Sequence, residues 1–139
     1  MYVVVLFLLE MQRYKKLLYI RCYSDKKYYL CSMLENKDFT QDEIYGERLL
    51  ISKQADQREL ASNIRAARAI LHSFPDTYII INAHTIELGR KNPEYTIDSR
   101  LGDRKGIMSE KGVTAGFKSA KKQGCKIVVI DLLQGSSND

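Results

Sequence analysis

The chain is poor in the residues that mark metal-thiolate and disulfide-rich proteins. It has 139 residues, and its three cysteines, Cys22, Cys31 and Cys125, form no Cys-x-x-Cys pair and have no zinc-ligand spacing. A zinc module and a secreted disulfide framework are therefore not expected, although a Cys22–Cys31 bridge across a hairpin stays open. We expect reduced, mostly buried thiols and a cytoplasmic protein.

Sequence motifs of several enzyme classes are also missing. The chain has no Gly-x-Ser-x-Gly, no cysteine paired with a nearby histidine and no Gly-x-x-x-x-Gly-Lys loop. The apolar run at residues 2–9 is far too short to span a bilayer, and it lacks the basic leader and cleavage site of a signal peptide. We expect this run to form a buried strand or a short helix, and we expect no membrane partner.

What the chain has in excess is positive charge. Its net charge is +5 and its pI is about 9.1, and residues 100–126 hold eight Lys or Arg against two acids. The summed field of such a surface favours a polyanionic partner, and we expect nucleic acid. The length, together with an apolar fraction of 45%, suits a single compact domain.

The spacing of apolar residues predicts an α/β (α+β) fold. Helices are predicted over 56–72, with Asp56 and Glu59 as a capping box, and over 113–123, with Gly124 as the C-cap. Strands are predicted at 49–52, 78–81, 95–97, 101–105 and 126–132, with a turn at 98–100. The order α-β-β-β-α-β from the first helix onward indicates a mixed β-sheet flanked by helices, in which 78–81 and 126–132 are buried on both faces.

The same pattern divides the chain into three parts. Residues 1–45 are predicted to be an N-terminal extension, in which 16–33 forms a β-hairpin with a polar turn. The polar segment 36–47 is predicted to be a loop or a weak helical turn that marks the boundary. Residues 46–134 form the core, and 135–139 form a frayed tail.

Two carboxylates and a lysine stand close together in the middle of the core. Pro93-Glu94 precedes one predicted strand, and Asp103-Arg104-Lys105 lies on the next. Because side chains alternate along a strand, Asp103 and Lys105 share one face and Arg104 points to the other. Carboxylate oxygens hold hard divalent cations, and an ammonium beside them suits a phosphate. The alternative is a surface ion pair between Asp103 and Lys105.

This arrangement resembles the motif of the PD-(D/E)XK nuclease superfamily. Residues 46–133 are similar to the C-terminal nuclease domains of contact-dependent-inhibition toxins and related mobile-element proteins. The resemblance implies a restriction-endonuclease-like core that hydrolyses phosphodiester bonds of DNA or RNA with Mg²⁺ or Mn²⁺, and it implies an immunity protein as a partner. It implies metal binding by Glu94, Asp103 and the Arg104 carbonyl, with Lys105 and Gln123 as further catalytic groups.

Other side chains have two interpretations each. Glu59 is either a further acid of the site or a helix cap, and Lys121 and Gln123 either support the site or form a solvated helix end. Tyr95 either stacks on a base or packs against its neighbours. Phosphate contacts without sequence readout are expected from the basic residues Arg100, Arg104, Lys118, Lys121, Lys122 and Lys126.

Two further functions stay open. His84 follows an apolar strand, and with Glu87 or Glu94 it would suit a metal-independent ribonuclease that acts on a ribose 2′-hydroxyl by general acid–base chemistry. A strand-end histidine bonded to backbone is the alternative for His84. The other function is a non-catalytic domain on a nuclease scaffold that binds nucleic acid or docks a partner. The apolar, tyrosine-rich N-terminal third leaves a homodimer open.

Overall fold

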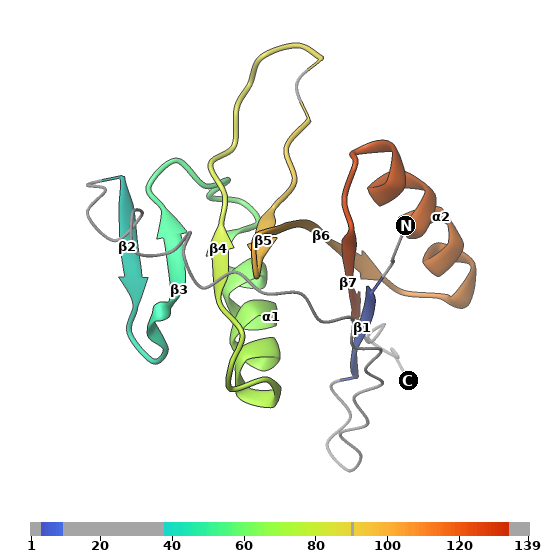
Figure 1. Ribbon diagram of the computed structural model, residues 1–139. Helices are drawn as coiled ribbons and strands as arrows, with labels where there is room; N and C mark the ends of the chain where they lie inside the picture. The colour runs from blue at the N-terminus through green and yellow to red at the C-terminus, as the bar shows by residue number, and fades with distance from the viewer. Residues whose placement is uncertain (1–3, 10–37, 90, 134–139) are drawn as a thin grey trace, which may run out of the picture.

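A computed structural model describes residues 4–9, 38–89 and 91–133, which form one seven-stranded sheet and two helices (Figure 1). The helices are α1 (Leu60–Ser73) and α2 (Glu110–Lys122). The strands are β1 (Val4–Leu9), β2 (Phe39–Asp42), β3 (Gly46–Ser52), β4 (Ile79–Ile81), β5 (Tyr95–Ile97), β6 (Arg100–Ile107) and β7 (Ile127–Leu132). Across the sheet their order is β1-β7-β6-β5-β4-β3-β2.

The sheet is mixed. β4, β5 and β6 form an antiparallel meander, and β6 and β7 are parallel neighbours joined by α2. β3 and β4 are also parallel and are joined through α1. From α1 onward the order is α-β-β-β-α-β, so the predicted fold class, a mixed sheet flanked by helices, is confirmed. β1 lies parallel to β7 at one edge, and β2 lies antiparallel to β3 at the other.

The two helices lie on opposite faces of the sheet. Because side chains alternate along β7, Val129 faces α1, whereas Val128 and Ile130 face α2. β7 is therefore buried on both faces, as its apolar run predicted. The cluster under α1 contains Leu49, Ala66, Ala67, Ile70, Leu71, Ile79, Ile81, Tyr95, Ile97, Ile127 and Val129. The cluster under α2 contains Ile107, Ala120, Val128 and Ile130, with Val113 and Phe117 beside them.

Of the predicted N-terminal extension, the structure describes residues 4–9 and 38–45. Residues 4–9 form strand β1, so the strand was the correct alternative and the short helix was wrong. β1 and β2 both belong to the same sheet as the core strands. The predicted hairpin at 16–33 and the predicted tail at 135–139 lie outside the described residues.

The prediction of a loop or weak helical turn at 36–47 is wrong for 39–42, which form β2, and for 46–47, which begin β3. Residues 43–45 form a turn as predicted, and 36–37 lie outside the described residues. Asp42 is 5% exposed, and its Oδ2 accepts hydrogen bonds from the N–H groups of Ile44 and Tyr45, both at 3.0 Å. Arg68 of α1 donates to the same carboxylate at 2.6 Å. A long-range ion pair therefore holds a polar edge strand that local sequence does not predict.

Helix α1 begins later than the predicted capping box. Asp56 Oδ1 accepts a hydrogen bond from the Arg58 N–H at 3.0 Å in a local turn. The helix starts at Leu60, and Glu59 occupies the N-cap position without a side-chain capping bond. The Glu59 carboxylate lies 2.5 Å from Arg104 instead. The capping box is therefore wrong, because a partner distant in sequence takes the carboxylate.

Two turns follow the prediction closely. β5 and β6 are joined through Asp98 and Ser99, whose φ angles of 44° and 66° are those of a two-residue hairpin loop that matches the strand twist. Gly124 follows the end of α2 with φ +77°. The Cys125 N–H donates to the Ala120 carbonyl at 3.1 Å. This bond is typical of an α-helix whose C-terminus is closed by a residue in the left-handed conformation.

Helix α2 lies close to β6 because it carries glycines at the contact. A Cβ added at Gly112 would lie 2.8 Å from Cγ2 of Ile107, and one added at Gly116 would lie 3.3 Å from Cγ of Lys105. α2 therefore runs antiparallel to β6, with its first turn at Ile107 and its second over Lys105. This packing keeps the stem of Lys105 in a fixed place.

The close packing predicts that Gly112→Ala lowers the free energy of unfolding by about 1 kcal/mol. The added methyl would overlap the branched side chain of Ile107, and overpacking costs about 1–3 kcal/mol against a helix-propensity gain of about 1 kcal/mol. Thr114→Ala, at an exposed position of the same helix, is the control and should change stability by less than about 0.5 kcal/mol. Urea denaturation measures both, and an unchanged midpoint for Gly112→Ala would contradict the packing.

Candidate active site

The sheet opens between β5 and β6, and the two predicted carboxylates lie at this opening. β5 pairs with β6 only as far as Tyr95 and Gly102, whereas β6 continues along β7 to Ile107. Within the described part of the chain, residues 103–107 therefore have a strand neighbour on one side alone. Continuing the β5–β6 register by one residue sets Glu94 opposite Asp103.

Pro93 and Glu94 determine how the ladder ends. The register would pair Pro93 with Arg104, but proline has no N–H to donate to the Arg104 carbonyl, and the Pro93 carbonyl accepts from Asn82 Nδ2 at 3.0 Å. Glu94 Oε2 instead accepts the hydrogen bond of the Arg104 N–H at 3.1 Å. Because the N–H and C=O of a strand residue point to the same side, the Arg104 carbonyl also faces the Glu94 side of β6.

Asp103 and Lys105 share the face of β6 that α2 covers, as the alternation predicts. Asp103 is 1% exposed, and its Oδ2 lies 2.6 Å from Nζ of Lys105, whose side chain is 25% exposed. The stem of Lys105 packs against Gly116. The ion pair of the alternative interpretation is therefore present, but it is not a surface pair, because the Asp103 carboxylate is buried.

The electrostatics at the opening suit a cation. Burial, followed by the charge of Asp103, raises the pKa of Glu94 to about 7. Asp103 Oδ2 is buried, and within the described residues it has no partner beyond the ion pair with Lys105. Carboxylate and carbonyl oxygens are ligands that Mg²⁺ and Mn²⁺ prefer, so Glu94, Asp103 and the Arg104 carbonyl fit such an ion. The described residues contain no group of three or more His, Cys, Asp and Glu side chains suited to a metal, so backbone and water oxygens would complete the shell.

The C-terminal end of α2 carries a buried amide and is followed by a thiol. Gln123 is the C-cap residue of α2, and its Oε1 is buried without a hydrogen-bond partner in the described structure. Cys125 is a free cysteine. Burial, followed by the charge of Asp103, raises the pKa of its thiol to about 11. Cys125 is therefore protonated at neutral pH and is not a nucleophile.

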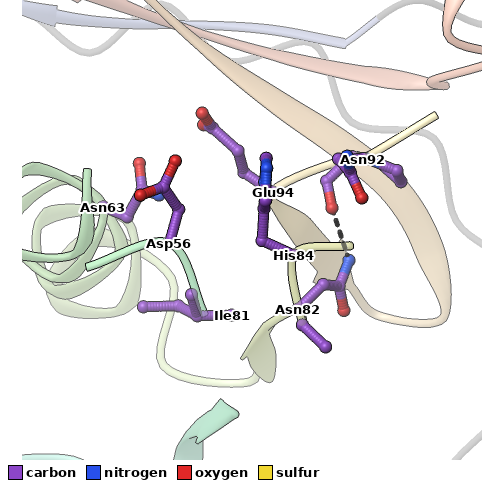
Figure 2. A pocket seen from close by; sticks show the side chains of 9 residues that line it. Asp56, Asn63, Ile81, Asn82, His84, Asn92 and Glu94 are labelled. Atoms are coloured by element: carbon purple, nitrogen blue, oxygen red, sulfur yellow. Dashed lines mark hydrogen bonds between the residues drawn. The ribbon is translucent and has the colours of Figure 1, made fainter. Parts of the chain in front are cut away.

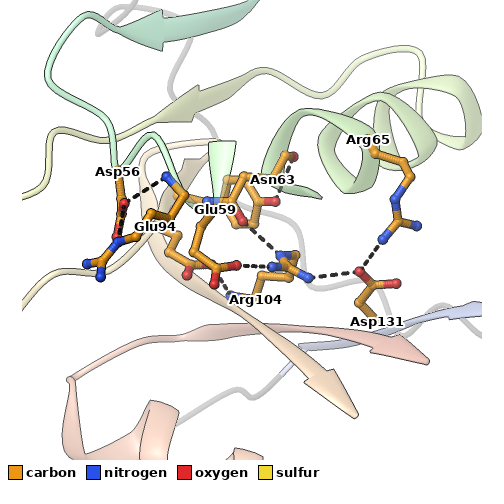
Figure 3. Close-up of polar contacts among 9 residues, drawn as sticks. Asp56, Glu59, Asn63, Arg65, Glu94, Arg104 and Asp131 are labelled. Atoms are coloured by element: carbon orange, nitrogen blue, oxygen red, sulfur yellow. Dashed lines mark hydrogen bonds and ion pairs between the residues drawn. The ribbon is translucent and has the colours of Figure 1, made fainter. Parts of the chain in front are cut away.

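The side chain of Arg104 points away from the opening and forms a polar network with α1 and β7 (Figure 3). Arg104 is 8% exposed. Its Nε donates to Asn63 Oδ1 at 2.8 Å, its Nη1 donates to Asp131 Oδ2 at 2.9 Å, and its Nη2 lies 2.5 Å from Glu59 Oε2. Arg65 also reaches Asp131, at 2.6 Å. The expectation that Arg104 contacts a phosphate is therefore wrong, because its guanidinium already has three partners.

The network includes residues that sequence reasoning missed. Asn63 on α1 is 3% exposed, and Asp131 on β7 is 2% exposed. The signal for Asp131 was a single carboxylate inside an apolar strand, and such a group is buried only with a partner. The sequence offers many arginines and does not indicate which one lies opposite.

The other predicted contact residues divide by exposure. Tyr95 is 0% exposed, and its hydroxyl donates to the Asn63 carbonyl at 2.8 Å. Packing is therefore the correct interpretation of Tyr95, and stacking on a base is wrong. Arg100 is half-buried and has a polar contact. The residues that are open to solvent are Lys118, Lys121, Lys122 and Lys126.

A small polar pocket adjoins Glu94 beside the segment that joins β4 to β5 (Figure 2). His84 lines this pocket together with Glu94, and its backbone N–H donates to the Gln54 carbonyl at 2.9 Å. Glu87 is exposed on the same segment and does not line the pocket. The residues around the pocket are Asp56, Asn63, Ile81, Asn82, Ala83, His84, Asn92, Pro93 and Glu94.

No protein-family model, no curated protein and no solved structure matches the chain. Neither of the two described helices is long and apolar enough to cross a bilayer.

The raised pKa of Glu94 predicts that metal-free protein becomes less stable as the pH rises from about 5 to 8. The pKa is about 7 in the folded state against an ordinary 4.5, so the folded state binds more protons in this window. The stabilisation that the protonated Glu94 contributes to the folded state is fully present below pH 4.5 and is lost as the pH rises through 7. For a partly exposed carboxyl it amounts to about 1–2 kcal/mol. Urea titrations in EDTA should show this slope in the wild type and a flatter one in Glu94→Gln. Equal slopes would contradict it.

The buried network predicts a large cost for Asp131→Ala. The change removes the buried carboxylate that Nη1 of Arg104 contacts and leaves the guanidinium with the half-exposed carboxylate of Glu59. Removal of one partner from a buried pair costs about 3–5 kcal/mol. The matched control is Arg58→Ala, because the Arg58–Asp56 pair has an arginine side chain that is 87% exposed. We expect that control to change stability by less than about 1 kcal/mol. Thermal unfolding compares the two, and similar small losses would argue against a buried network.

Proposed function

We propose that this chain is a metal-dependent nuclease that hydrolyses phosphodiester bonds of nucleic acid. The observation that carries the proposal is the convergence of Glu94, Asp103 and Lys105 at the opening between β5 and β6. Two acids and one ammonium, held close to the interior, suit a hard cation and a phosphate. The pKa of Glu94, raised to about 7, supports the proposal, because strongly shifted carboxyls cluster at functional sites.

Each residue has its own role in this proposal. Glu94, Asp103 and the Arg104 carbonyl would hold Mg²⁺ or Mn²⁺. Such an ion, when bound, lowers the pKa of a coordinated water and offsets the charge of the phosphate. Lys105 Nζ, which lies beside Asp103, stabilises the negative charge that grows on the phosphoryl oxygens. Gln123, whose Oε1 has no partner in the described structure, accepts a hydrogen bond from a water of the site.

Nucleic acid is the proposed partner, and its phosphates supply most of the contacts. The exposed ammonium groups that α2 and its C-terminal end present give affinity without reading sequence. They belong to Lys118, Lys121, Lys122 and Lys126, and Arg100 adds a charge at the start of β6. A toxin or mobile-element nuclease with an immunity protein follows from the family resemblance. The cytoplasm is the proposed location, and the free thiol of Cys125 supports it.

A metal-independent ribonuclease is the second candidate. The observation that favours it is the pocket that His84 and Glu94 line together. A carboxyl with a pKa of about 7 is suited to remove a proton from a ribose 2′-hydroxyl, while His84 protonates the leaving oxygen. This candidate needs neither Asp103 nor Lys105 for the chemical step.

Metal dependence and two sets of variants separate the candidates. For the first we expect cleavage of DNA or RNA that Mg²⁺ or Mn²⁺ stimulates and EDTA abolishes. Asp103→Asn and Lys105→Met should each lower the rate about 10²–10³-fold, because each removes a charge at the reacting phosphate. His84→Ala should cleave at the wild-type rate, and circular dichroism verifies that every variant is folded.

Other outcomes reject the first candidate. Cleavage that persists in EDTA and is lost in His84→Ala identifies the metal-independent ribonuclease. Tight binding of nucleic acid without cleavage at any metal concentration identifies a binding or docking domain. In both cases Asp103 and Lys105 have a structural role alone. Their variants should then change the urea midpoint without changing cleavage in the first case or binding in the second.

A further inference from the structure

The segment between β4 and β5 carries two apolar side chains that water surrounds. Figure 1 shows this segment rising beyond the end of the sheet before it returns to β5. Ile86 is 95% exposed and Leu88 is 105% exposed, the largest values among the big apolar residues that the structure describes. Gly89 follows with φ +79°, a left-handed conformation that lets the chain reverse there. We name Ile86 and Leu88 the tip.

Hydrogen bonds close the base of this segment. The Thr85 N–H donates to Asn92 Oδ1 at 2.9 Å, and Asn92 Nδ2 donates back to the Thr85 carbonyl at 2.8 Å. Below this pair, the Asn82 N–H donates to the Glu94 carbonyl at 2.9 Å, and Asn82 Nδ2 donates to the Pro93 carbonyl at 3.0 Å. A hydrogen-bonded stem therefore holds the tip away from the core.

We propose that the tip is a wedge that inserts Ile86 and Leu88 between stacked bases of the bound nucleic acid. The inference rests on the proposed function and extends it to the way in which the substrate is held. The part of the segment that returns from Gly89 to β5, which we call the returning arm, ends at Glu94. A phosphate bound at the site would therefore bring the neighbouring bases of the nucleic acid next to the segment. Leucine and isoleucine are among the side chains that unstack a base step in this way.

The small size of the tip and the positive charge near it favour insertion between bases over contact with a protein partner. A specific protein interface uses about 20–30 residues a side, whereas the tip offers two apolar side chains. A wedge at a base step needs no more than that. Lys91 is exposed on the returning arm, and Lys118, Lys121, Lys122 and Lys126 are exposed on α2 or just after it. This charge complements phosphates on both sides of an opened step.

The test measures unstacking directly. Wild-type protein in EDTA is added to a DNA duplex or to a folded RNA stem that contains 2-aminopurine, whose fluorescence rises when its neighbours unstack. We expect a rise on binding that the double variant Ile86→Ser/Leu88→Ser loses, with affinity that is about tenfold weaker or more. Ile44→Ser, whose side chain is also exposed but lies in the turn between β2 and β3, should keep both. The measurements on the DNA duplex and on the RNA stem together identify which nucleic acid is opened.

Three results would overturn the wedge. They are equal fluorescence and affinity in the wild type and the double variant, no binding of either nucleic acid, and a wild-type dimer in sedimentation that the double variant abolishes. The readout does not require cleavage. A fluorescence rise that depends on the tip, in a protein that never cuts, upholds the wedge and rejects the nuclease. Cleavage with no rise in fluorescence upholds the nuclease and rejects the wedge.

Discussion

The buried charge of Arg104 is the constraint on which the rest of the structure depends. A guanidinium that is 8% exposed is tolerated only when its N–H groups find anionic or carbonyl partners. Those partners come from α1 and β7, as Asn63, Glu59 and Asp131. The network therefore fixes the place of α1 on the sheet and the rotation of β6 beside β7. Alternation along β6 then directs Asp103 to the opposite face.

The opening between β5 and β6 depends on one proline. Past Tyr95, the antiparallel ladder would require an N–H from Pro93, and proline has none. The strands part at this point, and Glu94 satisfies the Arg104 N–H with its side chain. Past this point the Arg104 carbonyl has no β5 partner within the described residues. Pro93 thus has a physical role of its own, which is to end the ladder between β5 and β6 at Tyr95, next to Glu94.

Local periodicity was enough to predict the elements with apolar patterns, namely α1, α2 and β3 to β7. It also predicted that Asp103 and Lys105 share a face. It failed where the deciding partner is distant in sequence. β2 is polar and exists because Asp42 meets Arg68. From the sequence alone, Arg104 is expected to be a surface charge. Its burial depends on Asp131, which lies 27 positions away. The bond from the Arg104 N–H to Glu94 likewise required the register of two strands.

Arg104 serves two places in the structure with different parts of one residue. Its side chain belongs to the layer beneath α1, and its carbonyl lies in the plane of the sheet and faces the opening between β5 and β6. A mutational scan would identify position 104 as important for folding. It would not detect a role of the backbone carbonyl oxygen, because every amino acid carries one. In related sequences we would expect position 104 to covary with positions 59 and 131. The carbonyl oxygen of position 104 would stay in place whichever side chain the position carries.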